Sequence, residues 1–332
     1  MNDITKIALV GCGYWGKNLC RNFHALNALA RVVDATESGQ AQARLIAPRI
    51  KVSSHFEDAL NDTQIQAVAI ATPAETHAEL AIKAMKAGKD VYVEKPMALS
   101  VEDAERMKAV ADQTESILMV GHLLEYHPAV LKLRELIDSS ELGKINYVYS
   151  NRLSFGKVRT EENALWSFAP HDVAVILRLL GQSPVEIAAT GGSYLTKGLV
   201  DATVSNLRFK DESRAHIFVS WLHPFKEQRL VVVGEKKMAI FNDVVPYGEK
   251  LLLYPQTVEF DGKVPVLKKE DCEPIEYIDV EPLREECRHF LDCVTNRSKP
   301  LTDAQSGIEV LKVLHACQSS IDQNGIPVSL SQ

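Results

Sequence analysis

The chain has 332 residues, of which 46% are hydrophobic and 24% charged; this usage excludes a disordered or collagen-like protein. A single core rarely exceeds about 300 residues, so two domains are expected. The formal net charge of −7 argues against nucleic acid or an anionic membrane surface as a partner. No apolar run approaches the roughly 20 residues of a membrane-spanning helix, and acidic Asp3 near the amino terminus speaks against a signal peptide.

The six cysteines are scattered without C-x-x-C spacing, which indicates reduced thiols in a cytoplasmic protein. None of the ten histidines belongs to an H-E-x-x-H motif or a zinc-type cluster. No metal site is therefore expected.

Short β-rich runs alternate with helical patterns in the first third of the chain. Strands are predicted at Ile4–Val10, Arg31–Ala35, Ala67–Ala71, Asp90–Val93 and Ile117–Val120. Helices are predicted at Tyr14–Ala30, Pro73–Ala87 and Val101–Thr114. Such alternation predicts a parallel, doubly wound Rossmann-type sheet over residues 1–122.

The rhythm changes in residues 123–332. Helices are expected at Pro128–Asp138, near His171–Leu180, and at the end at Pro282–Asn296 and Asp303–Asn324. A strand is expected at Ile145–Ser154, and several strands joined by turns follow between Val185 and Val280. This pattern predicts an α+β domain with a large, mainly antiparallel sheet.

A glycine-rich loop, Gly11-Cys12-Gly13-Tyr14-Trp15-Gly16, follows the first predicted strand. Gly11 permits a tight turn, Gly13 lets the backbone approach a pyrophosphate, and Gly16 allows close packing of helix and strand. The alternative, a glycine turn without a ligand, is disfavoured by this context. The loop therefore predicts a dinucleotide site at a helix N-terminus.

Asp34 ends the next predicted strand, 18 residues after Gly16. A carboxylate there accepts hydrogen bonds from the adenosine ribose and repels a 2′-phosphate. The first basic residue after it is Arg44, so NAD is predicted rather than NADP.

Two further strand ends carry reactive residues: Ala71-Thr72-Pro73 with His77, and Glu94-Lys95-Pro96. Both turns should face the cofactor crevice, because ligands bind at the carboxyl ends of parallel strands. Taken alone, Pro73 could simply begin its helix, and Glu94-Lys95-Pro96 could be a solvated turn.

The glycine loop and these two turns, in this order on successive strands, resemble the Gfo/Idh/MocA family of sugar and polyol oxidoreductases over essentially the whole chain. The resemblance implies that Lys95 lies beside the nicotinamide and the reacting hydroxyl. There a partly desolvated ammonium of lowered pKa stabilises the negative charge developing on oxygen. The resemblance also implies a set of residues lining the cofactor cleft: Tyr14, Trp15, Thr72, Pro73, His77, Glu94 and His122.

In the second domain the family carries a histidine on a helix, with an aspartate four residues before it. His171 matches that histidine, which implies a proton relay or general base; without the family, a capping or core histidine is the commoner role. Ser167 stands where the family commonly has the aspartate and cannot carry its charge. Asp172 points about 100° away around the helix.

A locally basic segment, Arg152, Lys157 and Arg159, suggests an anionic substrate, because arginine suits diphosphate recognition; a solvated loop is the alternative. The candidate substrate-binding residues are Glu125, Tyr126, Arg152, Arg159, Asn163, Trp166 and Asp172.

The stretch from Asn151 to Asp172 and the segment from Glu281 to Cys293 most resemble the nucleotide-sugar branch of the family, which includes UDP-N-acetylglucosamine 3-dehydrogenases. This resemblance implies oxidation of the C3 hydroxyl of a UDP-N-acetylhexosamine, followed by a pyridoxal-phosphate aminotransferase, in lipopolysaccharide or other surface-glycan synthesis. It also implies a homodimer or homotetramer formed through the second domain's sheet. Two alternatives stay open: a dehydrogenase of a free sugar, an inositol or a dTDP-deoxysugar, and a non-catalytic NAD-sensing module.

Overall fold

The computed structural model describes residues 5–330, which form two compact units. The first contains the chain up to Tyr126 together with Val280–Leu311, and the second contains His127–Asp279 together with the residues from Lys312 onward. The sequence predicts a single domain boundary after residue 122. The structure adds that Val280–Leu311 groups with the amino-terminal residues.

The first unit is built on a six-stranded sheet in the order β3-β2-β1-β4-β5-β6. Every pairing in it is parallel, and the order reverses at β1 and β4, as in a Rossmann fold. The doubly wound sheet predicted from the sequence is therefore confirmed. The strands are β1 (Ile7–Val10), β2 (Leu29–Val33), β3 (Lys51–Ser53), β4 (Ala67–Ile70), β5 (Asp90–Glu94) and β6 (Leu118–Gly121). Asp3 and Ile4, the first residue of the first predicted strand, lie outside the described residues.

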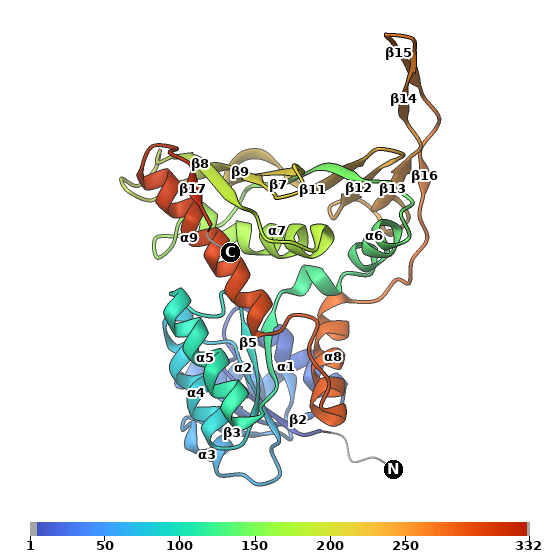
Figure 1. Ribbon diagram of the computed structural model, residues 1–332. Helices are drawn as coiled ribbons and strands as arrows, with labels where there is room; N and C mark the ends of the chain where they lie inside the picture. The colour runs from blue at the N-terminus through green and yellow to red at the C-terminus, as the bar shows by residue number, and fades with distance from the viewer. Residues whose placement is uncertain (1–4, 331–332) are drawn as a thin grey trace. The chain divides into compact units, whose positions relative to one another are not determined.

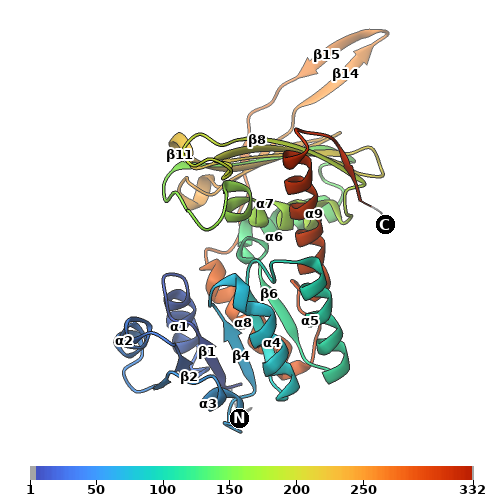
Figure 2. The same ribbon diagram turned by 90° about the vertical axis from the view of Figure 1, so that its left-hand side faces the viewer.

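Helices cover both faces of this sheet, with α4 and α5 on one face and α1 and α8 on the other (Figure 2). Phe23, Tyr92 and Phe290 meet edge to face between the sheet, α1 and α8, with ring centroids 5.8–6.5 Å apart. The α8 segment thus completes the core of the first unit. The helices are α1 (Gly16–Ala25), α2 (Glu37–Ile46), α3 (Glu57–Leu60), α4 (His77–Lys86), α5 (Val101–Thr114) and α8 (Pro282–Asn296), with 3-10 turns η1 (Ala74–Thr76) and η2 (Leu123–Tyr126).

The second unit is built on a nine-stranded sheet in the order β16-β13-β12-β11-β7-β10-β9-β8-β17. Its pairings are antiparallel except that of β7 with β10. This mixed, mostly antiparallel sheet confirms the predicted fold class. Its strands are β7 (Ile145–Phe155), β8 (Glu186–Gly192), β9 (Ala202–Arg208), β10 (Arg214–Ser220), β11 (Leu222–Gly234), β12 (Met238–Asn242), β13 (Leu251–Tyr254), β16 (Glu273–Pro274) and β17 (Val328–Ser329).

Helices α6 (Pro128–Asp138) and α7 (Ala164–Leu180) lie on the same face of this sheet (Figure 1). The buried alternate residues of β10, Ala215, Ile217 and Val219, face α7. The last helix, α9 (Ala304–Asp322), is tied to β8 by Ser320, whose Oγ accepts the Ala189 N–H at 2.8 Å.

A hairpin of β14 (Thr257–Asp261) and β15 (Val264–Lys268) projects from the second unit's sheet (Figure 1), and the 3-10 turn η3 (Tyr247–Glu249) precedes β13. Within residues 5–330, no helix is long and apolar enough to cross a membrane.

Candidate active site

The glycine loop joins β1 to α1. Gly11 has φ +89°, and a Cβ at this position would lie 2.7 Å from the Ala71 carbonyl oxygen. A Cβ on Gly16 would lie against the Gly11 carbonyl. These two glycines therefore allow the turn and the close packing of the loop against β4.

The third glycine leaves room for a ligand. A Cβ on Gly13 would meet no heavy atom within 4 Å, so the backbone there is open to close approach. Trp15, the N-cap residue of α1, makes no side-chain capping bond, and Tyr14 is 77% exposed. The loop and the first turn of α1 are thus accessible to an anion, which a helix N-terminus attracts.

Asp34 lies just after β2, directly behind this loop. Its Oδ2 accepts the Cys12 N–H at 2.7 Å, and its Oδ1 accepts the Thr36 N–H at 2.8 Å and the Thr36 hydroxyl at 2.7 Å. A carboxylate has about four acceptor positions, so one remains for a ribose hydroxyl. Arg44 lies on α2 and contacts Gln40 at 3.4 Å.

His77 links the two turns that follow β4 and β5. Its ring nitrogens lie 2.9 Å from the Thr72 carbonyl and 2.9 Å from the Pro96 carbonyl. Burial lowers the pKa of His77, although both carbonyls oppose the change. A neutral imidazole has a single N–H, so it donates to one of the two carbonyls and only contacts the other. Pro73 precedes the 3-10 turn η1 as its N-cap residue, so the turn itself does not begin with proline.

Glu94 ends β5 and is buried, and Lys95 follows it half-buried. The Glu94 carboxylate accepts hydrogen bonds from the Trp15 indole N–H, from the Tyr92 hydroxyl at 3.0 Å and from the Lys95 N–H at 3.3 Å. The charges of Lys95 and Glu94 also attract each other. The Lys95–Pro96 peptide is cis.

His122 lies just after β6, buried near Lys95. Burial, reinforced by the Lys95 charge, lowers the pKa of His122 to about 3. Among the described residues, neither ring nitrogen has a hydrogen-bond partner. A neutral imidazole with unsatisfied nitrogens is typical of a site that completes its hydrogen bonds with a ligand.

Glu125 and Tyr126, two predicted substrate-binding residues, are both buried within the first unit. The Tyr126 hydroxyl lies 2.9 Å from the Thr302 Oγ1 and 3.7 Å from the Met119 sulfur. Tyr126 therefore belongs to the core beneath α8. Its role toward a sugar stays a prediction.

In the second unit, α7 carries His171 and begins at Ala164, earlier than expected. Asn163 caps the helix, because its side-chain oxygen accepts the Trp166 N–H at 3.2 Å. Pro170 lies inside the helix, and Ser167 is buried one turn before His171.

Two predicted substrate ligands, Arg152 and Asp172, bind each other, and their role toward a substrate stays a prediction. Arg152 on β7 donates to both oxygens of Asp172, at 2.8 and 3.1 Å, and the Ser150 hydroxyl donates to the same carboxylate at 2.6 Å. This buried pair holds α7 against β7 beside His171. Arg159 pairs with Glu162 at 3.0 Å.

Asn163 and Trp166 also share a partner within the second unit. The Asn163 amide and the Trp166 indole donate to the Gln318 side-chain oxygen of α9, at 2.8 and 3.3 Å. The Trp166 ring packs edge-on against His315. Binding roles for these residues remain predictions.

Three features of the first unit fit a dinucleotide. These are the open space over the Gly13 backbone, the remaining acceptor position on Asp34 and the His122 ring nitrogens without hydrogen-bond partners among the described residues. Within residues 5–330, no group of three or more His, Cys, Asp or Glu side chains could hold a metal ion. The fold and this site define an NAD-dependent oxidoreductase.

Comparisons with known proteins identify the family. Residues 5–122 match the domain described as "Oxidoreductase family, NAD-binding Rossmann fold", and residues 130–240 match the GFO/IDH/MocA C-terminal domain. The chain belongs to the GFO/IDH/MocA oxidoreductase family, which contains NAD-dependent dehydrogenases of sugars and polyols.

Two relatives and one solved structure show the range of similarity. The UDP-N-acetylglucosamine 3-dehydrogenase of Acidithiobacillus ferrooxidans is 30% identical over 192 residues, covering 58% of this chain and 59% of that one. The scyllo-inositol 2-dehydrogenase (NAD(+)) of Bacillus subtilis is 26% identical, covering 99% and 97%. A structure of the Acidithiobacillus ferrooxidans enzyme superposes with a TM-score of 0.84 at 22% identity, covering 96% and 98%.

Proposed function

We propose that this chain oxidises the C3 hydroxyl of a UDP-N-acetylhexosamine, with UDP-N-acetylglucosamine as the first candidate, to the 3-keto sugar. The observation that carries the proposal is the ammonium of Lys95 at the carboxyl end of β5, with buried Glu94 and neutral His122 as neighbours. The similarity to a UDP-N-acetylglucosamine 3-dehydrogenase supports the choice of sugar.

NAD, when bound, would supply the acceptor for the hydride that leaves the carbinol carbon. Lys95 donates a hydrogen bond to the hydroxyl oxygen and stabilises the negative charge that develops there as its proton leaves. His171 takes that proton. We assign the transfer to Nε2, because Nδ1 of His171 is buried. The proposal requires Lys95 and His171 to act on one hydroxyl group.

The substitution of serine for the family's usual aspartate at position 167 changes the source of negative charge. The Glu94 carboxylate accepts a hydrogen bond from the Lys95 backbone N–H, and the charges of the two side chains attract each other. We propose that Glu94 provides the counter-charge for Lys95 that Ser167 cannot provide.

A panel of candidate substrates tests the reaction. NADH formation is followed by its absorbance with UDP-N-acetylglucosamine, UDP-N-acetylgalactosamine, a dTDP-deoxysugar, myo-inositol and scyllo-inositol. We expect turnover of a UDP-N-acetylhexosamine, with a 3-keto product identified by NMR. Turnover of an inositol without any UDP-sugar would instead support the second candidate, which the scyllo-inositol relative favours.

The Lys95→Ala variant distinguishes an enzyme from an NAD-sensing module. Loss of one charge-stabilising donor should lower kcat by about 10²–10³-fold, while the glycine loop and Asp34 keep NAD binding. The control is Lys86→Ala at the exposed end of α4, which should retain activity. Normal turnover by Lys95→Ala would contradict the assignment.

We also propose a cytoplasmic role in surface-glycan or lipid A synthesis, with an aminotransferase acting on the keto sugar. The six cysteines, all free and five of them buried, support a reducing compartment. A coupled assay with a pyridoxal-phosphate aminotransferase and glutamate tests the pathway step, since a 3-keto product should yield an amino sugar.

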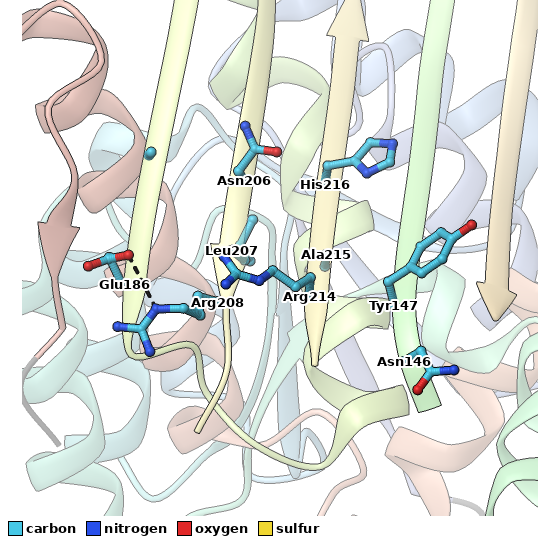
Figure 3. A pocket seen from close by; sticks show the side chains of 10 residues that line it. Asn146, Tyr147, Glu186, Asn206, Leu207, Arg208, Arg214, Ala215 and His216 are labelled. Atoms are coloured by element: carbon cyan, nitrogen blue, oxygen red, sulfur yellow. Dashed lines mark hydrogen bonds and ion pairs between the residues drawn. The ribbon is translucent and has the colours of Figure 1, made fainter. Parts of the chain in front are cut away.

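A homodimer or homotetramer formed through the open sheet face completes the proposal. A hollow of about 600 Å³ lies on the face of the sheet opposite α7, and Figure 3 shows the side chains that line it. The Glu186–Arg208 ion pair lies beside it, and exposed Tyr147 borders it. The hollow is lined by side chains of β7, β8, β9 and β10: Asn146, Tyr147, Glu186, Ala188, Asn206, Leu207, Arg208, Arg214, Ala215 and His216.

A further inference from the structure

Three carboxyl groups are buried together in the first unit, and the reaction described above uses only one of them directly. Glu94 ends β5, Glu125 lies in η2, and Glu286 lies on the core-facing side of α8, where its exposed fraction is 0%. Both Glu94 and Glu125 act electrostatically on Glu286. Three carboxyl groups that are buried close together cannot all be ionised, because their negative charges repel each other and lack water.

Glu94 has the donors that a carboxylate needs. It accepts the Trp15 indole, the Tyr92 hydroxyl and the Lys95 N–H. Burial raises the pKa of Glu94, but these donors and the Lys95 charge counteract the increase. Glu94 is therefore the member of the cluster whose surroundings best support a negative charge.

Glu286 has no comparable support. In the described part of the chain, neither carboxyl oxygen has a hydrogen-bond partner that satisfies normal geometry. Burial raises the pKa of Glu286 well above its usual range, and Glu94 and Glu125 raise it further, with only the Tyr92 hydroxyl acting in the opposite direction. Burial without a hydrogen-bond donor and beside two other carboxyl groups therefore favours the protonated form of Glu286.

The groups around Glu286 include one hydrogen-bond acceptor for a carboxyl proton. The titratable groups that interact with it come from β5, η2 and α8: Tyr92, Glu94, Glu125, Tyr126 and Cys287. The polar contacts from α1 to the start of α8 go to Glu281, which pairs with Arg21 and accepts the Asn22 amide N–H at 3.2 Å. Of these groups, Tyr92 already donates to Glu94 and keeps its oxygen free to accept.

We propose that Glu286 is a positioning residue that, as a neutral acid, donates a hydrogen bond to the Tyr92 hydroxyl. Tyr92 in turn holds Glu94 in place as the single carboxylate of the cluster, next to Lys95 and Trp15. The chain Glu286–Tyr92–Glu94 then couples α8 to the glycine loop and to the reactive lysine. Glu286 itself touches neither cofactor nor substrate. The inference rests on the proposed function only in the role given to Lys95.

NADH binding in the absence of sugar tests this chain of bonds. Fluorescence titrations from about pH 5 to about pH 9 compare wild type, Glu286→Gln, Glu286→Leu and Tyr92→Phe. The amide of Glu286→Gln is neutral and still donates, so its affinity and pH dependence should match wild type. Loss of a hydrogen bond supporting a charged group in Glu286→Leu or Tyr92→Phe should weaken binding about tenfold at neutral pH.

The sign of the pH effect follows from Glu94. Weaker donation raises the pKa of Glu94, so the loss of NADH affinity on acidification should begin at higher pH in Glu286→Leu and Tyr92→Phe. The double variant Glu286→Leu/Tyr92→Phe should bind NADH no more weakly than whichever single variant binds it more weakly. Both substitutions break the same chain of hydrogen bonds, so their effects should not add.

Equal losses in Glu286→Gln and Glu286→Leu would show that Glu286 works as a carboxylate and would overturn the proposal, as would wild-type behaviour of Glu286→Leu. If Glu286→Leu does not fold, Glu286→Gln and Tyr92→Phe, which nearly conserve volume, decide the matter. Glu285→Gln, which removes only a pair with Arg288 on the same helix, is the control. Because no sugar is present, a wrong substrate assignment leaves these results unaffected.

Discussion

The bidentate bond between Arg152 and Asp172 fixes the residue next to His171. Asp172 is buried and receives three hydrogen bonds, two from Arg152 and one from Ser150. Removing one partner of a buried pair costs about 3–5 kcal/mol, because the other charge is left unsatisfied. The pair thus holds α7 against β7 beside His171, while the diphosphate contact that the basic character of Arg152 suggested stays a prediction.

Gly121, the last residue of β6, is a second position of local importance, because its lack of a Cβ leaves room for neighbouring side chains. A Cβ there would lie 2.6 Å from the Tyr92 hydroxyl and 3.0 Å from the Glu94 Oε2. Gly121→Ala should therefore destabilise the protein by roughly 1–3 kcal/mol and weaken NADH binding, because Glu94 supports Trp15.

Urea unfolding and NADH titration measure both effects of Gly121→Ala. Gly248→Ala serves as the control, since a Cβ there meets nothing within 4 Å. A Gly121→Ala protein as stable and as tight-binding as the Gly248→Ala protein would show that the Tyr92–Glu94 contact has no such importance.

At the scale of elements, hydrophobic periodicity and the residues that begin or end helices and strands predicted most of the secondary structure of the first unit. Ser100, whose hydroxyl accepts the Asp103 N–H, and the left-handed Glu115 bound α5 at the predicted residues. The glycine loop and Asp34 were recognisable because their spacing follows from the geometry of one βαβ unit.

The predicted start of α7 near His171 was wrong. A proline normally disrupts the interior of a helix, so the local pattern favoured a start after Pro170. In the structure, Asn163 caps the helix at the Trp166 N–H, and Pro170 lies inside the helix. Burial of every residue from Val173 to Leu177 shows how packing against the sheet outweighs this local preference.

The role of α8 in the first unit could not be read from local spacing, because its partners on α1 and β5 lie far earlier in the chain. One signal was present. Leu283, Glu286, Cys287 and Phe290 recur at helical spacing and are all buried, so a glutamate stands on an otherwise apolar face. The β14–β15 hairpin was missed because its strands are short and lie almost wholly outside the core.

Helix α7 offers a test at this scale, since its cap also ties it to α9. Asn163→Ala removes the acceptor for the Trp166 N–H and the donor to Gln318, and loss of the cap alone costs about 1 kcal/mol. Asn163→Asp keeps the acceptor and loses only the donor. Urea unfolding should therefore rank wild type above Asn163→Asp and Asn163→Asp above Asn163→Ala; equal stability of the two variants would contradict the capping role.

For the whole molecule, the second unit's exposed apolar surface bears on assembly. The register of the β14–β15 hairpin places cross-strand partners Val258 with Leu267 and Phe260 with Pro265, and directly opposed residues share a face. One face of the hairpin is thus entirely apolar, and Phe260 is 70% exposed. The other face carries the Glu259–Lys268 ion pair.

An isolated two-stranded hairpin is at best marginally stable in water, so the proposed assembly of identical chains should cover this apolar face. Phe260→Asp and Leu267→Asp should weaken self-association at least tenfold, because burying one such side chain contributes about 1.5–3 kcal/mol. Sedimentation equilibrium over a range of concentrations measures the change. Val266→Asp, the same kind of substitution on the opposite face of the hairpin, is the matched control and should leave association nearly unaltered. Equal effects of the substitutions on both faces, or a wild-type protein that is monomeric at every concentration, would exclude the apolar face as a contact between subunits.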